Sequence, residues 1–286
     1  MTLGLTGATG GIGSRVAARL AEEHLPLRLI ARDPARAPDV PGAEVARAEY
    51  RDIDAMRAAL AGVETLFLVS GGESADRVDE HFAAVDAAAD AGVGRIVYLS
   101  FLGAAPGSTF TFARDHFHTE ERIGASGMRH TFLRDSMYAD YVPVFATADG
   151  VIQGPAGNGR VSWVARDDVA DVAAAVLLDP DKHDDKTYDV TGPEALTMTE
   201  TATLLSEVSG ARVVYREETI EEARESRAPS GAPDWEIEGW VTSYAAIAAG
   251  ELETVSDAVE RITGHAPEAL GDWLRRHPET WAHLAG

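Results

Sequence analysis

Short apolar runs alternate along the first half of the chain with longer segments whose apolar residues recur at helical spacing. The opening run, residues 3–5, is followed by Val16, Ala17 and Leu20, which would share one face of a helix. The run 65–69 is continuously apolar, as is typical of a strand that is buried on both faces of a parallel sheet. The pattern predicts strands at residues 3–5, 27–31, 45–48, 65–69, 95–99 and 129–134, a helix that opens straight after the glycines and includes residues 16–20, and helices at 55–60, 77–91 and 112–126.

This alternation predicts βαβ units with right-handed crossovers. We therefore expect an α/β fold, a Rossmann-type doubly wound parallel sheet with a smaller, mainly helical C-terminal lobe. Residues 1–150 would form the dinucleotide-binding domain, and residues 151–286 the substrate-side lobe, interleaved with the first part as one compact unit. In this second part we predict strands at 160–164 and 187–190, a helix at 166–178, and a helix that starts with the capping-box pair Thr197 and Glu200.

A glycine-rich turn separates the first strand from the first helix. Its sequence, Thr-Gly-Ala-Thr-Gly-Gly-Ile-Gly at residues 6–13, has the layout of a dinucleotide site. One glycine permits the tight turn, another lets the backbone approach a pyrophosphate, and the third lets helix and strand pack closely. The helix N-terminus would offer free N–H groups to the phosphates. The residues that we expect at the phosphates are Gly7, Thr9, Gly10, Gly11, Ile12 and Gly13.

The end of the second strand bears on the choice of cofactor. In dinucleotide folds the residue at this point meets the ribose of the adenosine. Arg32 stands there, and Asp33 follows it. A guanidinium suits a 2′-phosphate, whereas a carboxylate suits a free 2′-hydroxyl, so this order favours NADPH over NADH. The alternative is that Arg32 is a solvated loop cation.

Small and aromatic residues follow the next strands. Ser70, Gly71 and Gly72 end one strand, and Ser100 and Phe101 end another. Ligands of parallel sheets bind at the carboxyl ends of the strands, so these residues and the glycine turn should line one edge. The residues expected to form an apolar lid over a flat substrate are Phe101, Met137, Tyr138 and Tyr141, with ordinary core packing as the alternative.

Composition excludes several functional classes. The net charge of −22 argues against binding to nucleic acid or to anionic membranes. The chain has no cysteine, hence no disulfide, thiolate nucleophile or zinc–thiolate site. It has no apolar segment long enough to span a membrane, and we expect a soluble, cytoplasmic protein. His116 and His118 are two residues apart and would not converge on a helix, so we expect no metal site.

Lysine usage removes the usual proton relay of short-chain dehydrogenases. That relay needs a lysine four residues after a tyrosine, which it makes more acidic. The only lysines are Lys182 and Lys186, and no tyrosine stands four residues before either. His116 is then the expected proton donor or substrate contact, while a solvated helix face is an equally good interpretation of His118.

The whole chain resembles the NmrA-like branch of the atypical short-chain dehydrogenases, and most closely its NADPH-dependent quinone oxidoreductases and triphenylmethane reductases. The resemblance implies NADPH contacts from the glycine turn, Arg32, residues 70–72, the run after Arg134, and Arg166. The motifs that carry it are residues 6–13, 31–34, 49–52 and 62–64, His116 with Thr119 and Glu120, residues 126–127, 133–134 and 166–169, and Tyr188 with Thr191, Gly192 and Pro193. The remaining expected cofactor contacts are Glu49, Ser100, Ser136 and Met137.

The expected function is an NADPH-dependent reduction of a quinone or a similar flat electrophile, a small-molecule substrate. The nicotinamide supplies the hydride, and the protein holds the acceptor against it. His116 and Tyr138 are the candidate catalytic residues, and the product anion can take its proton from water. The alternative is a non-catalytic, redox-sensing regulator that binds NADP(H) and acts through a partner protein. We expect a monomer or a homodimer.

Overall fold

The sheet predicted from the apolar runs forms the framework of the structure, a computed structural model that describes residues 2–284. Its seven strands follow the order β3-β2-β1-β4-β5-β6-β9. The pairings of β1 with β2 and β4, of β2 with β3 and of β4 with β5 are parallel. The strands are β1 (Leu3–Thr6), β2 (Leu27–Ala31), β3 (Glu44–Arg47), β4 (Thr65–Val69), β5 (Arg95–Phe101), β6 (Arg129–Asp135) and β9 (Lys186–Val190).

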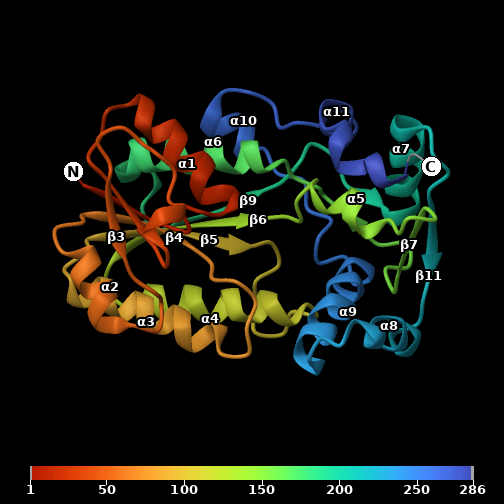
Figure 1. Cartoon of the computed structure of the whole chain (residues 1–286), viewed down its shortest axis with the longest axis horizontal. Coiled ribbons are helices and arrows are strands. Elements are labelled where there is room, and N and C mark those ends of the chain that lie inside the picture. Colours follow the sequence, from red (N-terminus) through yellow and green to blue (C-terminus); the bar gives the residue numbers. More distant parts are fainter. Residues whose placement is uncertain (1, 285–286) are drawn as a thin grey trace. The chain divides into compact units, whose positions relative to one another are not determined.

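Helices cover both faces of this sheet (Figure 1). On one face lie α1 (Gly11–Glu22) and α6 (Arg166–Leu178), and on the other lie α2 (Ile53–Leu60), α3 (Arg77–Asp90) and α4 (Thr111–Ala125). Side chains of the inner strands, such as Leu5, Leu66 and Ile96, are fully buried between these two layers. The predicted Rossmann-type, doubly wound sheet is therefore confirmed.

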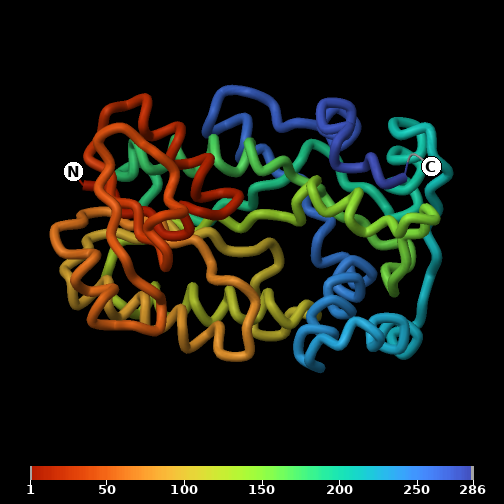
Figure 2. The backbone as a smooth tube through the Cα atoms, viewed as in Figure 1, coloured from red at the N-terminus to blue at the C-terminus, as the bar shows by residue number. Residues whose placement is uncertain are grey.

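The chain forms two compact units, and each unit is built from three separate stretches of the sequence. The first comprises the chain up to Pro106 with Asp115–Arg134 and Val169–Tyr188, and the second comprises the remainder. Residue 150, where the sequence predicts a division, lies inside the second unit. Figure 2 shows how the chain returns to the first unit, where green α6 runs beside red α1. An ion pair between Arg19 and Asp171, at 2.5 Å, joins these two helices.

The second unit is mainly helical, as predicted for the C-terminal lobe. The capping box of Thr197 and Glu200 is present at the start of α7. The described elements of this unit are α5 (Tyr141–Phe145), β7 (Val151–Gly154), β8 (Arg160–Val161), β10 (Leu196–Thr197), α7 (Met198–Ser209), β11 (Val214–Glu217), α8 (Ile220–Arg227), η3 (Ala228–Ser230), α9 (Asp234–Ala248), α10 (Ala258–Thr263), α11 (Leu270–Arg276) and η4 (Pro278–Leu284).

One predicted strand is shorter than expected. The apolar pattern predicts a strand at 160–164, but β8 ends at Val161. The N–H of Ser162 donates to the carbonyl of Leu252, and the N–H of Val164 donates to the carbonyl of Met137. Because these groups bond to two different segments, residues 162–164 form no continuous ladder with one partner strand, and the prediction was wrong there.

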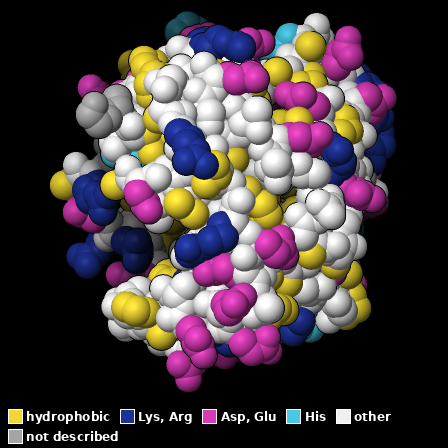
Figure 3. All heavy atoms as spheres, turned by 90° about the vertical axis from the view of Figure 1, so that its right-hand side faces the viewer, with side chains coloured by type: hydrophobic (Ala, Val, Ile, Leu, Met, Phe, Trp, Pro, Cys, Tyr) yellow, Lys and Arg dark blue, Asp and Glu magenta, His cyan; other side chains and the backbone are white. Residues whose placement is uncertain are grey.

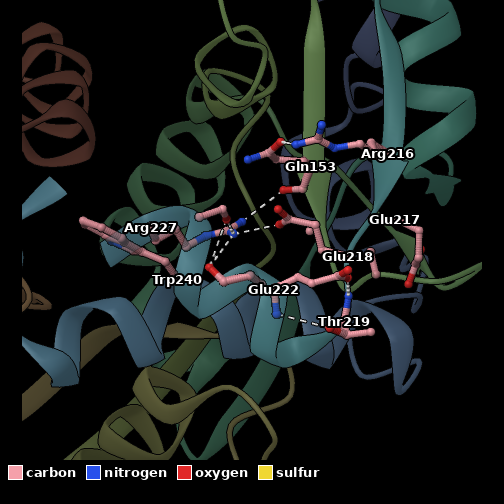
Figure 4. Close-up of polar contacts among 12 residues, drawn as sticks. Gln153, Arg216, Glu217, Glu218, Thr219, Glu222, Arg227 and Trp240 are labelled. Carbon is pink, nitrogen blue, oxygen red and sulfur yellow. Dashed lines mark hydrogen bonds and ion pairs between the residues drawn. The ribbon is translucent and has the colours of Figure 1, made fainter. Parts of the chain in front are cut away.

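A buried ion pair joins α8 to the short parallel sheet of β7 and β11 (Figure 4). Nη1 of Arg227 lies 3.0 Å from a carboxylate oxygen of Glu218, and both side chains are largely buried. Nη2 of Arg227 donates to the carbonyl of Gln153 over 3.0 Å, and Arg216 donates to the side chain of the same glutamine. One guanidinium thus ties the end of α8 to both strands.

The surface carries both signs of charge despite the acidic composition. Figure 3 shows basic side chains scattered among more numerous acidic ones on one face of the molecule. Within residues 2–284, no helix has both the length and the apolar character required to cross a membrane.

Candidate cofactor and substrate site

The turn between β1 and α1 requires glycine at two positions. Gly7 has a φ of 63°, in the left-handed region that side chains disfavour. A Cβ on Gly13 would lie 2.2 Å from the carbonyl oxygen of Gly7, so only hydrogen fits between helix and strand. The N–H of Gly10 donates to that same carbonyl over 2.8 Å and closes the turn. The geometry agrees with the tight turn and the close helix–strand packing predicted from the sequence.

The start of α1 suits an anion. Its N-cap, Gly10, supplies no side-chain cap, and the first turn holds no acidic residue. The first N–H groups of a helix lack intrahelical partners and lie at the positive end of its dipole. Thr9, Gly10 and Gly11 are exposed, while Ile12 and Gly13 are buried. These features fit the pyrophosphate of a dinucleotide, which the backbone N–H groups of this turn would hold.

Three exposed arginines lie at or just after the ends of β2 and β3. Arg32 comes directly after β2, and Arg36 lies in the short helix η1 (Pro34–Arg36). Arg47, at the end of β3, is the register partner of Ala31. In the part of the chain that the structure describes, none of these arginines forms an ion pair. Asp33 caps η1, where its carboxylate accepts the N–H of Ala35, so the acidic residue of the predicted pair has a local structural role.

The loop after β3 is attached to the ends of two strands by Tyr50. Its hydroxyl donates to the carbonyl of Val69 over 2.5 Å and lies 2.7 Å from Oγ1 of Thr6. Thr6 in turn accepts the N–H of Val69 over 2.9 Å. Burial raises the pKa of Tyr50 well above its usual range. The neighbouring Glu49 is exposed, beside these strand ends.

The loop after β4 is held by helix α3. The N–H of Gly71 donates to Nε2 of His81 over 2.8 Å, and its carbonyl accepts from Nε of Arg77 over 3.1 Å. Ser70 and Gly71 are half-buried, and Gly72 is exposed. The peptide groups of Gly71 are therefore satisfied inside the protein, and the small residues on either side lie nearer to solvent.

The end of β5 is fixed by a buried carboxylate. The hydroxyl of Ser100 donates to Oε1 of Glu120 over 2.6 Å. Arg134 binds both oxygens of the same carboxylate, at 2.9 and 2.5 Å. The hydroxyl of Ser100, a predicted cofactor contact, is thus bound to the protein itself, while the next residue, Phe101, is half-buried.

His116 lies inside the first unit. Its Nδ1 is 2.9 Å from the hydroxyl of Tyr98, and its Nε2 is 3.1 Å from Nη2 of Arg77. The ring centroid of Phe101 lies 6.0 Å from that of the imidazole. Burial and the charge of Arg77 lower the pKa of His116 well below its usual value. The imidazole is therefore neutral and bonded at both nitrogens, whereas His118 is exposed on another side of the helix.

The second unit contains the segment predicted to follow the cofactor-binding strands. Ser136 and Met137 are buried there. The N–H of Ser136 donates to the carbonyl of Val190, and the carbonyl of Met137 accepts from Val164. The hydroxyl of Ser162 lies 3.2 Å from that of Ser136. These bonds fix the backbone that precedes Tyr138.

The guanidinium of Arg166 lies over the rings of two tyrosines of this unit, Tyr138 and Tyr141. It lies 4.7 Å from the ring centroid of Tyr138 and 5.7 Å from that of Tyr141, and it forms an ion pair with Asp140 at 3.1 Å. The hydroxyl of Tyr138 donates to Asp135. Removal of this hydroxyl from water, together with the Asp135 carboxylate, raises the pKa of Tyr138 well above its usual value. It therefore keeps its proton at neutral pH.

Within each unit the structure groups many of the predicted residues. The first unit holds the glycine turn, Arg32 and the residues after β3, β4 and β5, and the second unit brings Ser136, Met137, Tyr138, Tyr141 and Arg166 together. Sequence reasoning missed Arg47, whose position depends on strand register, and the contacts of Arg77 and His81 with Gly71. The one available signal was the spacing of Arg77 and His81, which are four residues apart and therefore lie on the same face of α3.

The turn, the anion site and the doubly wound sheet define a dinucleotide-binding Rossmann protein. A family model described as NAD(P)H-binding matches residues 7–180. The chain belongs to this NAD(P)H-binding family.

Named relatives define the branch. The chain is 32% identical to the NAD(P)H azoreductase of Xenophilus azovorans over 278 residues, which is 96% of each protein. The NADPH-dependent quinone oxidoreductase of Escherichia coli, solved in complex with NADPH, superimposes with a TM-score of 0.86 at 31% identity, covering 99% of this chain and 100% of that one. The triphenylmethane reductase of Citrobacter sp., complexed with NADP(H), has a TM-score of 0.84 at 31% identity, covering 99% of both chains.

These relationships identify the chain as an oxidoreductase, and they confirm the resemblance inferred from its motifs. The negative transcriptional regulator NmrA shares the fold, with a TM-score of 0.76 at 15% identity. At that identity the likeness concerns the fold alone.

Proposed function

We propose that this protein is an NADPH-dependent reductase that transfers hydride to a quinone or to a similar flat electrophile. The observation that carries the cofactor choice is the group of exposed arginines, Arg32, Arg36 and Arg47, beside the strand ends that follow the glycine turn. Most other arginines of this acidic chain are paired with carboxylates. Guanidinium groups left without carboxylate partners match a phosphate monoester such as the 2′-phosphate.

The chemistry proposed here needs no dedicated acid. NADPH supplies a hydride when bound. A reduced quinone is a stabilised anion that can take its proton from water, so the missing Tyr/Lys pair costs the reaction little. The phenol of Tyr138 donates its hydrogen to Asp135, and both ring nitrogens of His116 are already hydrogen-bonded. These contacts favour roles in orientation for both residues, and their catalytic role stays a prediction.

The acceptor side is proposed to involve the aromatic residues. Tyr141 is exposed for 42% of its surface, and its ring stacks on that of Phe145 with an angle of 6° between the planes. Flat aromatic surfaces with a nearby cation suit planar, electron-poor molecules. Phe101, Met137, Tyr138 and Tyr141 remain the predicted substrate contacts, and Ser136, Met137 and Arg166 the predicted cofactor contacts of the second unit.

A parallel kinetic screen tests this proposal. NADPH and NADH would be oxidised separately with quinones, azo dyes and triphenylmethane dyes, and absorbance at 340 nm would be followed with and without each acceptor. We expect oxidation that depends on both NADPH and a quinone, with NADH the weaker donor. Binding of NADPH without turnover across the whole panel would instead favour the non-catalytic sensor.

A further inference from the structure

Obligatory donors fix the protonation of His81 and His116. A backbone N–H can only donate, so Nε2 of His81, which accepts from Gly71, carries no proton. Arginine also only donates, so Nε2 of His116, which meets Arg77, is likewise unprotonated. Burial, with the charge of Arg77, lowers the pKa of His81 to about 3, in agreement with this assignment. Both imidazoles are therefore neutral and carry their hydrogen on Nδ1.

The Nδ1 hydrogens of these two histidines point to the hydroxyl groups of Thr119 and Tyr98. Nδ1 of His81 donates to Oγ1 of Thr119 over 2.8 Å, and Thr119 donates onward to the carbonyl of Asp115 over 2.8 Å. Nδ1 of His116 donates to the hydroxyl of Tyr98 in β5 over 2.9 Å. The bonds of His81 run in one direction, from the N–H of Gly71 through the imidazole to Thr119. Arg77 instead donates in two directions, to the carbonyl of Gly71 and to His116.

This polar network is costly to bury, and it links α3 to α4 as well as to the loop after β4. Arg77, His81, His116 and Thr119 are all buried. A carboxylate oxygen of Asp115 lies 3.7 Å from Nη1 of Arg77. Burying polar groups is unfavourable unless their hydrogen bonds are made, and here two of those bonds end on the N–H and carbonyl of one loop glycine. The network therefore fixes the position of that loop relative to α3 and α4.

We infer that Arg77, His81, His116 and Thr119 form a clamp that positions residues 70–72 for the cofactor. This inference rests on the proposed function, because it takes NADPH as the ligand of that loop. In the clamp His116 is a positioning residue that acts through Arg77. A loop held before binding does not have to be ordered by the ligand, so the clamp increases affinity for the cofactor.

The absence of a side chain at Gly71 is part of the same arrangement. A Cβ there would lie 3.3 Å from Nε2 of His81 and 3.5 Å from the ring of Tyr50. The contact with His81 is tighter than usual, and a methyl group would press on the acceptor nitrogen of the clamp. Glycine therefore lets His81 approach the peptide closely enough to accept its N–H.

Two matched pairs of variants test the clamp. Thr119→Val keeps the shape of the side chain but removes its hydrogen bonds, whereas Thr119→Ser keeps the hydroxyl. His81→Leu removes the acceptor for Gly71, whereas the amide oxygen of His81→Gln can still accept. For each variant we would measure thermal unfolding, hydrogen exchange of the Gly71 amide by NMR, and the Kd for NADPH by titration without an acceptor.

We expect Thr119→Val and His81→Leu to accelerate exchange at Gly71 and to weaken NADPH by about tenfold, equivalent to about 1.4 kcal/mol. The Kd of Thr119→Ser and of His81→Gln for NADPH should stay within about threefold of the wild-type Kd. If Thr119→Val fails to fold, the His81 pair decides. Lower thermal stability with wild-type Gly71 exchange and wild-type NADPH affinity would overturn the clamp. A wild-type protein that binds no NADPH would overturn the proposed function and the clamp together.

Discussion

A Cβ placed on Gly13 would lie 2.2 Å from the carbonyl oxygen of Gly7. The backbone fixes the position of a Cβ, and its partner here is a backbone oxygen, so no side-chain rotation can relieve the contact. The closeness of the first helical turn to the preceding strand is what aims the N–H groups of α1 at a phosphate.

Gly13→Ala should therefore displace the turn and weaken NADPH binding strongly. We also expect a loss of about 1–3 kcal/mol in the free energy of unfolding, as for other overpacked sites. Gly124→Ala in α4 is the matched control, because a Cβ there meets nothing within 4 Å. Titration with NADPH and urea denaturation would check both variants. Equal affinity of Gly13→Ala and wild type would remove the turn from the cofactor site.

Arg32→Ala should weaken NADPH by on the order of 1–3 kcal/mol and leave NADH nearly unchanged, because a charge-assisted contact with the 2′-phosphate is lost. Arg47→Ala should act in the same direction, since Arg47 stands beside Ala31 in the sheet register. Arg57→Ala, which removes a half-buried arginine paired with Asp54 and Asp90, is the control. The two dissociation constants would be measured for each variant. Parallel losses for NADPH and NADH would place Arg32 away from the 2′-phosphate.

The neutral histidines predict a loss of stability in mild acid. The pKa of His81 is about 3 in the folded protein, against about 6.5 when unfolded. Between these values the unfolded chain binds a proton that the folded chain does not, so the free energy of unfolding falls as the pH drops below about 6.5. The limiting slope is about 1.4 kcal/mol per pH unit for each such histidine, and His116 adds to it in the same direction.

Urea unfolding between about pH 5 and pH 7.5 would check this dependence, in a range where most carboxylates stay ionised. His81→Gln should flatten the curve, because it removes one of the two groups. His118→Gln, which removes an exposed imidazole, should keep the wild-type curve. A wild-type stability that is constant across the range would contradict the buried, neutral state of both rings.

Tyr138→Phe tests whether the phenol is a proton donor. Because its hydrogen is bound to Asp135 and its pKa is raised, we expect kcat to fall by less than about tenfold, below the usual contribution of a general acid. Tyr138→Ala should instead raise KM for the acceptor, because the ring surface is lost. Steady-state kinetics with one quinone would separate the two effects. A loss in kcat of about 10²-fold or more for Tyr138→Phe would assign the proton transfer to this hydroxyl.

Glu218→Gln should destabilise the protein by about 3–5 kcal/mol, because it leaves the buried Arg227 without its counter-charge. Asp272→Asn breaks an exposed pair with Arg275 and should cost at most about 1 kcal/mol. Chemical denaturation of both variants checks the contrast. A Glu218→Gln variant as stable as Asp272→Asn would mean that water reaches the Arg227 guanidinium.

The sequence predicted the first half of the fold well because each β-strand there is a short apolar run with a clear end. Thr65–Val69 is buried on both faces, so its composition alone marks it as a central strand. The second unit was harder to predict. The helix at Tyr141–Phe145 contains Pro143 and has only five residues, too few to show a helical period.

The candidate site was predictable where it depends on local chemistry. The glycine turn could be recognised because Gly7 and Gly13 are close in sequence. The contact of His81 with Thr119 joins residues 38 positions apart, and that of Arg77 with His116 joins residues 39 apart. Such pairs depend on how α3 packs beside α4, which no single periodicity encodes.

The arginines at the ends of β2 and β3 affect the rate at which an anionic dinucleotide associates with the protein. A chain with a net charge of −22 repels an anionic dinucleotide at long range. Attraction by Arg32, Arg36 and Arg47 extends over about one Debye length, some 10 Å at 0.1 M ionic strength. Moderate salt would screen the distant repulsion before it weakens the direct contacts. The association rate of NADPH therefore depends on two opposing effects, the long-range repulsion by the net charge and the short-range attraction by the arginines. This rate should rise as salt is first added and fall only at higher ionic strength.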